Sequence, residues 1–200
     1  MLYQNSSVTG VASLITPRLY LTDYVTAMNS KKLEELGITH IISVIEHKPN
    51  LPDFIPEIQR HHLPLSDLPE AQILHHLDTT TAFIRRALEE NETNKVLVSI
   101  NRFGSSLTHW LINWQVHCRL GISRSATVVC AYLIATSKLT VEESIERVQS
   151  LRRVVSPNFG FRQQLGEYAR RYAEDEPNPH QMSMPDILIS GGDVYMDCSW

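Results

Sequence analysis

The feature that most restricts the fold of this chain is a repeated alternation between short strand-like segments and helix-like segments. Residues 38–45 (ITHIISVI) are rich in β-branched side chains, which are typical of a buried strand. Between residues 71 and 90, apolar side chains instead recur at the spacing of one helix face. Because helices can connect parallel strands and cover the sheet that they form, this alternation predicts an α/β fold.

Sequence signals also give approximate bounds for the individual elements. The helix expected at 30–36 is capped by Asn29 or Ser30 and ends at Gly37. Ser156, which is followed by a proline, is predicted to cap the last helix. The other expected elements are strands at 14–21 (interrupted near Pro17), 38–45, 61–65 and 95–100, and helices at 71–90, at 123–137, from a capping box at 140–143, and from 156 to about 174.

The composition predicts a single soluble domain. The chain has 200 residues, of which 42% are hydrophobic and 20% charged, enough apolar surface for one core. Its net charge of −4 argues against a general nucleic-acid binder, and its longest nearly apolar run, 128–135, is too short to span a bilayer. Three cysteines cannot form a paired disulfide framework and fit a reducing compartment. We therefore expect a cytoplasmic location that can extend to the nucleus, without nucleic-acid or membrane partners.

One segment combines residue types that point to a chemical site. Residues 117–125 (HCRLGISRS) place five residues between Cys118 and Arg124, immediately before a strong helix. The amides of such a loop and the positive end of the helix can surround a tetrahedral dianion, while the Arg124 guanidinium binds two of its oxygens. The same field lowers the pKa of the Cys118 thiol and favours the thiolate. A buried structural cysteine is the ordinary interpretation of a lone thiol, but the fixed spacing of thiol, glycine, arginine and serines favours a phosphate site.

At these residues the chain resembles the cysteine-dependent protein tyrosine phosphatase superfamily, specifically the small, atypical dual-specificity phosphatases. The resemblance covers about residues 11–172. It includes, in the family's order, residues 15–21 (ITPRLYL), 36–42 (LGITHII), 95–98 (KVLV) and 156–161 (SPNFGF). It implies a protein tyrosine phosphatase-like fold, with a central, mostly parallel sheet flanked by helices. It also implies hydrolysis of phosphotyrosine and phosphoserine/threonine without a metal or another cofactor.

The resemblance further implies roles for individual residues. Cys118 would attack phosphorus to give a phosphocysteine intermediate, and Ser125 would stabilise the thiolate as it leaves. Asp67, in the segment LSDLP, would be the general acid, although local sequence alone favours an ordinary turn aspartate and Glu70 is the reserve candidate. Arg124 and the loop amides would stabilise the transition state. The residues that would bind the substrate phosphate are Arg119, Leu120, Gly121, Ile122, Ser123 and Arg124.

An unusual 18-residue insertion, Ser99–Val116, separates the strand at 95–98 from His117, where the family runs directly from strand to loop. Two arrangements are open. Either residues 95–98 keep their place and the insertion bulges out, or residues 111–116 replace them as the strand that leads into the loop. The hypothesis for its origin is an unremoved intron or splice variant, because 18 × 3 = 54 nucleotides preserve the reading frame. The alternative is a lineage-specific surface loop whose Trp110 and Trp114 dock elsewhere.

These features predict one catalytic domain at residues 1–174, with the insertion at 99–116, and a disordered C-terminal tail at 175–200. The expected function is a dual-specificity protein phosphatase that acts on a phosphoprotein, for which a kinase is one candidate. The alternative is a catalytically impaired, phosphate-binding pseudophosphatase whose geometry the insertion disturbs. A redox-sensing thiol at Cys118 is a third interpretation.

Other chemistry-bearing residues receive structural interpretations. His61–His62 and His75–His76 lack cysteine or carboxylate partners at ligand spacing, so we expect no metal site. Cys130 lies in the apolar helix after the loop and is expected in the core. Arg85–Arg86 and Arg152–Arg153 are expected on solvated helix faces.

Overall fold

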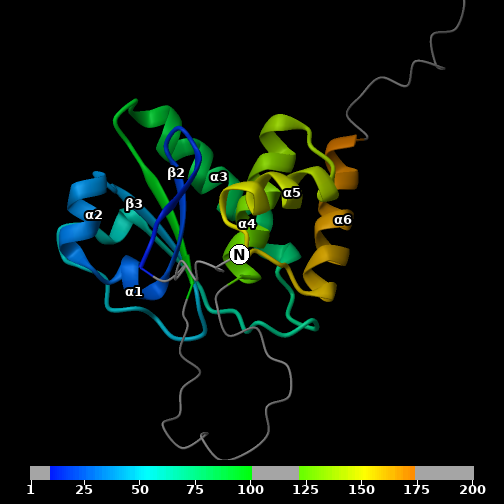
Figure 1. Cartoon of the computed structure of the whole chain (residues 1–200), viewed down its shortest axis with the longest axis horizontal. Helices are drawn as coiled ribbons and strands as arrows, with labels where there is room; N and C mark the ends of the chain where they lie inside the picture. Colours follow the sequence, from blue (N-terminus) through cyan, green and yellow to red (C-terminus); the bar gives the residue numbers. More distant parts are fainter. Residues whose placement is uncertain (1–9, 101–121, 174–200) are drawn as a thin grey trace, which may run out of the picture.

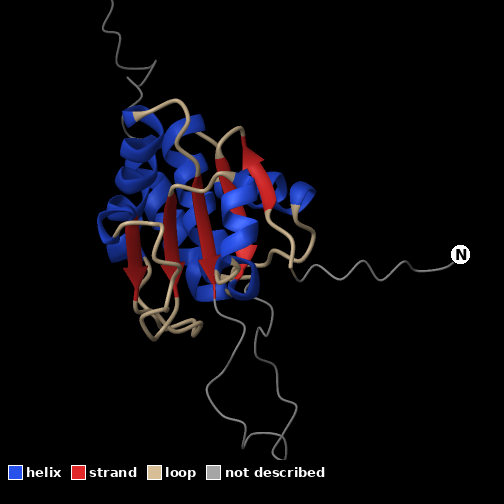
Figure 2. Ribbon diagram, turned by 90° about the vertical axis from the view of Figure 1, so that its left-hand side faces the viewer, coloured by secondary structure: helices blue, strands red, loops and turns tan. Residues whose placement is uncertain are grey.

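The fold is built on a mostly parallel sheet. The structure is a computed structural model that describes residues 10–100 and 122–173. Its strands are β1 (Ser13–Thr16), β2 (Leu19–Asp23), β3 (His40–Val44), β4 (Arg60–Leu63) and β5 (Val96–Ile100). They lie in the order β1-β2-β5-β3-β4, with β1 antiparallel to β2 and the other pairs parallel (Figure 2). The predicted α/β fold with a central, mostly parallel sheet is confirmed.

Helices cover both faces of this sheet. They are α1 (Tyr24–Ala27), α2 (Ser30–Leu36), α3 (Leu74–Glu90), α4 (Arg124–Ser137), α5 (Val141–Leu151) and α6 (Phe159–Ala173), with a short 3-10 helix, η1, at Glu57–Gln59. α1 and α2 lie on one side of the sheet and α3 to α6 on the other (Figure 1). None of the helices in the described ranges is long and apolar enough to cross a membrane.

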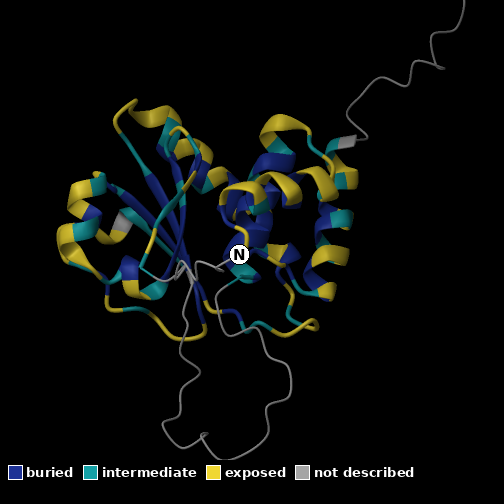
Figure 3. Cartoon of the chain, viewed as in Figure 1, coloured by how far each residue is buried: buried dark blue, intermediate teal, exposed yellow. Residues whose placement is uncertain are grey.

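Side chains of the central strand alternate between two hydrophobic clusters. Val96 and Val98 of β5 are fully buried in the larger cluster, which α3 to α6 share. Leu97 points the other way and is fully buried in the smaller cluster, to which α1 and α2 contribute. Burial on both faces of the sheet (Figure 3) explains why β3 and β5 have nearly continuous apolar sequences. α6 packs against the larger cluster through the fully buried side chains of Phe161, Leu165 and Tyr168.

Two helix starts follow their sequence signals. The Asn29 side chain accepts a hydrogen bond from the Lys32 amide at 3.1 Å, which caps α2. α2 ends at Gly37, whose φ of 68° lies in the left-handed region that favours glycine. The capping box predicted at 140–143 begins α5.

The predicted start of α6 is wrong. This helix begins at Phe159, three residues after the predicted cap, Ser156. Asn158 occupies the capping position, where its Oδ1 accepts a hydrogen bond from the Phe161 amide at 2.9 Å. A serine followed by proline resembles a cap, but the backbone enters the helix only after Asn158.

Two further predictions need correction. α3 begins at Leu74 rather than residue 71, because residues 71–73 form turns that the Gln164 side chain of α6 holds. Arg152 is not solvated: it is 4% exposed, and its Nη1 donates a hydrogen bond to the Val11 carbonyl at 3.1 Å. Its neighbour Arg153 is exposed, as expected.

β5 decides between the two arrangements predicted for the segment Ser99–Val116. The strand includes residues 96–98 and continues through Ser99 to Ile100, which pairs with both β2 and β3. Retention of the original strand is therefore confirmed, although it runs two residues into the segment. Replacement by residues 111–116 is wrong, because β5 already fills the position between β2 and β3. The rest of the segment, including Trp110 and Trp114, and the tail predicted at 175–200 lie outside the described residues.

The fold predicts that stability falls in mild acid. His40 and His61 flank the ring of Phe83, and burial lowers the pKa of each below its ordinary value of 6.5. The unfolded chain therefore binds protons more readily than the folded chain. The stability contributed by the two neutral rings is complete above pH 6.5 and is lost as the pH falls through their lowered pKa values.

We expect urea unfolding to show a lower free energy of unfolding at about pH 5 than at about pH 7.5. His61→Phe keeps a ring against Phe83 but cannot titrate, so this variant should lose less stability over the same interval. An equal loss in the variant and the parent chain would contradict this assignment.

Candidate active site

Asp67 lies in the segment that follows β4 at the carboxyl edge of the sheet. This acid segment, defined as residues 64–73, connects β4 to α3. Leu65 anchors it in the larger hydrophobic cluster, and the Asp67 side chain is only 13% exposed. Glu70, the reserve candidate for the acid, is exposed on the same segment. Burial therefore favours Asp67 over Glu70 as the carboxylate of a site.

Arg124, the first residue of α4, contacts the acid segment directly. Its Nη1 donates a hydrogen bond to the Leu65 carbonyl at 2.7 Å. Its Nε lies 3.9 Å from Oδ2 of Asp67, an ion pair in which the Arg124 side chain is 11% exposed. Parallel strands bring their carboxyl ends to one edge, and at this edge α4 begins beside the end of β4. The structure thus brings together two predicted site residues that are distant in sequence.

Three buried polar atoms at this position have no hydrogen-bond partner among the described residues. They are Asp67 Oδ2, Arg124 Nε and Ser125 Oγ. Buried polar groups in folded proteins are nearly always hydrogen-bonded, so a cluster of unsatisfied ones indicates a place where a polar ligand binds. No side-chain cap is found at the start of α4 among the described residues, so its first amides and positive dipole end can interact with an anion. A phosphate group offers oxygen acceptors for both the guanidinium and the amides.

Ile122 and Ser123 connect the described end of the predicted loop to the start of α6. The Ile122 carbonyl accepts a hydrogen bond from the Ser156 amide at 3.1 Å. Ser123 is fully buried, and its hydroxyl accepts a hydrogen bond from the Asn158 amide at 2.9 Å. These contacts fix the direction in which the chain enters α4. The predicted nucleophile Cys118 and the predicted phosphate-binding residues Arg119, Leu120 and Gly121 lie outside the described residues.

Asn158 belongs to the site but was not among the predicted site residues. Its Nδ2 donates a hydrogen bond to Oδ1 of Asp67 at 3.1 Å. The sequence offers one signal for this residue, since asparagine before an apolar helix is a favoured cap. A cap, however, predicts only contacts within its own helix. The contact with Asp67 depends on the packing of α6 against the acid segment.

The described cysteine is unsuited to chemistry. Cys130 is a free, fully buried thiol on α4, and burial raises its pKa to about 12. It is therefore a packing residue, as predicted, and cannot replace Cys118 as a thiolate. No group of three histidine, cysteine or acidic residues that could hold a metal ion occurs within residues 10–100 and 122–173.

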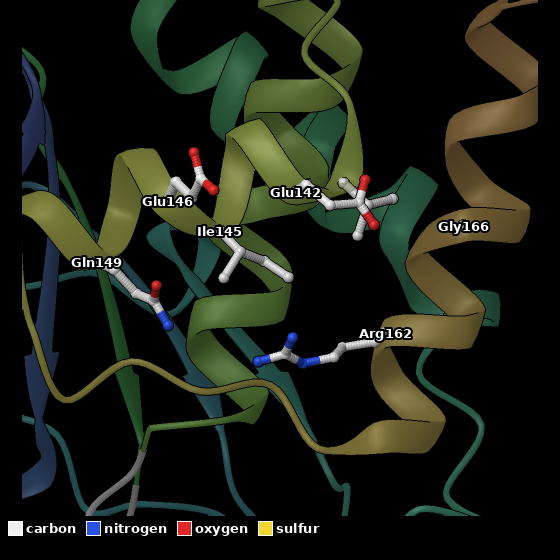
Figure 4. Close-up of a pocket in the computed structure, with 7 residues that line it drawn as sticks. Glu142, Ile145, Glu146, Gln149, Arg162 and Gly166 are labelled. Carbon is white, nitrogen blue, oxygen red and sulfur yellow. The ribbon is translucent and has the colours of Figure 1, made fainter.

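A groove lies between α5 and α6, away from the Arg124–Asp67 pair. Figure 4 shows Glu142, Glu146 and Gln149 of α5 on one side of it and Arg162 of α6 on the other. Ile145 lies at its centre (Figure 4). Neither Asp67 nor Arg124 lines this groove, so it is separate from the candidate active site.

The sequence is similar to dual-specificity phosphatases. A family model described as the dual specificity phosphatase catalytic domain matches residues 112–171. Dual specificity protein phosphatase 26 of Homo sapiens is 32% identical over 174 residues, which cover 86% of this chain and 73% of that protein. Protein phosphatase Slingshot homolog 3 of Homo sapiens is 34% identical over 158 residues, or 78% of this chain but 20% of that protein. The chain thus spans about a fifth of the length of some curated relatives that it matches.

The fold is similar to solved structures of the same group. The crystal structure of human DUSP28 matches with a TM-score of 0.66 and 26% sequence identity, over 81% of this chain and 95% of that chain. Sequence similarity, fold similarity and the paired arginine and aspartate beside the uncapped helix start agree with one another. The chain belongs to the dual-specificity protein phosphatase family.

Proposed function

We propose that the chain is a protein phosphatase that hydrolyses phosphotyrosine and phosphoserine/threonine through a phosphocysteine intermediate. The observation that carries the proposal is the largely buried Arg124–Asp67 pair, in which one nitrogen and one oxygen have no hydrogen-bond partner among the described residues. A cationic anion-binding group beside a buried carboxyl group is the pairing that phosphoryl transfer to a thiolate requires. Membership of the family supports the same activity.

The proposed reaction has two steps. The Cys118 thiolate attacks phosphorus, the bond between phosphorus and the ester oxygen breaks, and the Asp67 carboxyl group gives its proton to that oxygen. In the second step the Asp67 carboxylate takes a proton from water, and the water oxygen displaces sulfur from phosphorus. Arg124 and the α4 amides stabilise the charge on the transferred group in both steps. Ser125 donates a hydrogen bond to the thiolate as it leaves, which would satisfy its unpartnered hydroxyl.

We further propose protein kinases as substrates. Support comes from one relative, MAP kinase phosphatase with leucine-rich repeats protein 3 of Dictyostelium discoideum, which is 32% identical over 80% of this chain. We also propose a cytoplasmic location that can extend to the nucleus, because the three cysteines of the chain suit a reducing compartment.

Loss of the predicted nucleophile tests the proposed function. The chain should hydrolyse an aryl phosphate in the presence of a chelator, and Cys118→Ser should lower kcat by at least about 1000-fold, since a hydroxyl is a far weaker nucleophile than a thiolate. Rates are measured by release of the coloured phenol. Cys130→Ala is the matched control because the Cys130 thiol is buried and inert. Hydrolysis that depends on a metal, or that survives Cys118→Ser, would contradict the mechanism.

Removal of the predicted acid tests the role of Asp67. Asp67→Asn keeps the size of the side chain but has no acidic proton to give, so kcat on a phosphotyrosine peptide should fall about 100-fold. KM should change little, because the substrate phosphate is bound mainly by Arg124 and amides. Steady-state phosphate release measures both constants. Glu70→Gln, on the exposed side of the same segment, should leave them unchanged; the opposite pattern would assign the acid to Glu70.

A further prediction concerns the segment after β5. Because β5 extends to Ile100 and the described site atoms come together at the sheet edge, we expect the full chain to be active. A chain without residues 101–116 keeps the whole of β5 and should have a kcat within about 10-fold of the full chain. If activity appears only after this removal, the full chain is the impaired, phosphate-binding form.

A further inference from the structure

The acid segment lies along the start of α6 at several successive points. Figure 1 shows the chain after β4 passing close to the first turn of α6. Residues of α6 and its cap contact this chain near Asp67, Pro69 and Ala71. The contacts therefore extend over most of the acid segment and do not depend on one side chain.

Asn158 makes a different hydrogen bond with each end of its side-chain amide. Its Oδ1 accepts from the Phe161 amide at 2.9 Å, and its Nδ2 donates to Asp67 Oδ1 at 3.1 Å. The amide cannot be reversed, because an oxygen would then face the carboxylate and a nitrogen would face the N–H of Phe161. Its backbone N–H, which donates to Ser123, joins the same residue to the entry of α4.

This hydrogen bond distinguishes the two oxygens of the Asp67 carboxyl group. Oδ1 is engaged by Asn158, whereas Oδ2 faces Arg124 Nε at 3.9 Å and has no hydrogen-bond partner among the described residues. An oxygen that accepts a hydrogen bond from an amide N–H is a poor position for the proton. Oδ2, on the side of the guanidinium that binds the substrate phosphate, is therefore the oxygen that carries the transferable proton.

Gly160 allows α6 to approach the acid segment closely. A Cβ at this position would lie 1.9 Å from the backbone oxygen of Pro69, far inside contact distance. A side chain here would push the two segments apart. Glycine is thus required by the close approach, and the approach brings Asn158 within hydrogen-bonding distance of Asp67.

Gln164, one turn further along α6, fixes the other end of the acid segment. Its Nε2 donates to the Ala71 carbonyl at 2.9 Å, and its Oε1 accepts from the Leu74 amide at 2.9 Å. Leu74 begins α3, which has no side-chain cap of its own. Gln164 therefore accepts a hydrogen bond from a backbone amide that has no partner within its own helix.

We propose that the start of α6 is a clamp, formed by Asn158, Gly160 and Gln164, that holds the acid segment so that Oδ2 of Asp67 faces the substrate. Asn158 is the positioning residue of this clamp: it acts through Asp67 and does not touch the substrate. The inference rests on the proposed phosphatase function, in which Asp67 supplies a proton.

The variant Asn158→Ser removes the contact with Asp67 but keeps the cap of α6. Serine caps a helix about as well as asparagine, but it is too short to reach Asp67. Phenyl phosphate needs a proton on its leaving oxygen, whereas 2,4-dinitrophenyl phosphate does not. We expect kcat for phenyl phosphate to fall about 10- to 100-fold, and kcat for the dinitrophenyl ester to fall less than about 3-fold. Equal falls for the two esters, or no fall for either, would overturn the proposal.

Hydrogen exchange tests the clamp without relying on activity. Gln164→Ala and Asn158→Ser should each speed amide exchange in residues 66–74 by about fivefold or more. The control is Gln163→Ala, because Gln163 is exposed and immediately precedes Gln164 on the same helix. If the parent chain hydrolysed neither ester, the phosphatase function would be contradicted, while unchanged exchange in the first two variants would contradict the clamp.

Discussion

A largely buried guanidinium group determines how the site of this protein is assembled. The Arg124 side chain is 11% exposed, and a cation with so little contact with water needs acceptors or an opposite charge from the protein. The Leu65 carbonyl supplies an acceptor and the Asp67 carboxylate supplies the charge. Both groups belong to the acid segment, so their contacts with Arg124 connect the start of α4 to the chain that follows β4. The remaining Nε, which has no hydrogen-bond partner among the described residues, is available for a substrate.

The position of that guanidinium is fixed by the packing of its helix. Most of α4 is buried between the sheet and the other helices of the same face. A helix enclosed in this way cannot shift without opening the core, so the first residue of α4 is held firmly. Firm placement matters because a displacement of about 1 Å in an active site can cost on the order of 100-fold in rate. The core therefore contributes to catalysis by restricting where Arg124 and the first amides of α4 can lie.

The sequence predicted those parts of the fold that depend on local chemistry. The bounds of α2 follow from a capping asparagine and from Gly37. The strands β3 and β5 follow from runs of apolar residues, which are typical of strands in a sheet that is covered on both faces. The errors occur where a distant segment decides the outcome. Arg152 has the sequence surroundings of a solvated residue, but the Val11 carbonyl accepts one of its hydrogen bonds. α3 begins late because Gln164 holds the turns that precede it.

Asn158 serves both as the cap of its own helix and as a hydrogen-bond donor to a distant segment. Serine, aspartate and asparagine are about equally good helix caps, so capping alone would accept any of them at this position. Contact with Asp67 is more selective, because it needs a donor that reaches a carboxylate. Serine is too short, and aspartate would place a second negative charge against the first and favour protonation of one of them. Asparagine has an acceptor for the Phe161 amide and a donor for Asp67 on the same planar group. Of the three residues that cap a helix about equally well, it is therefore the one that also suits the contact with Asp67.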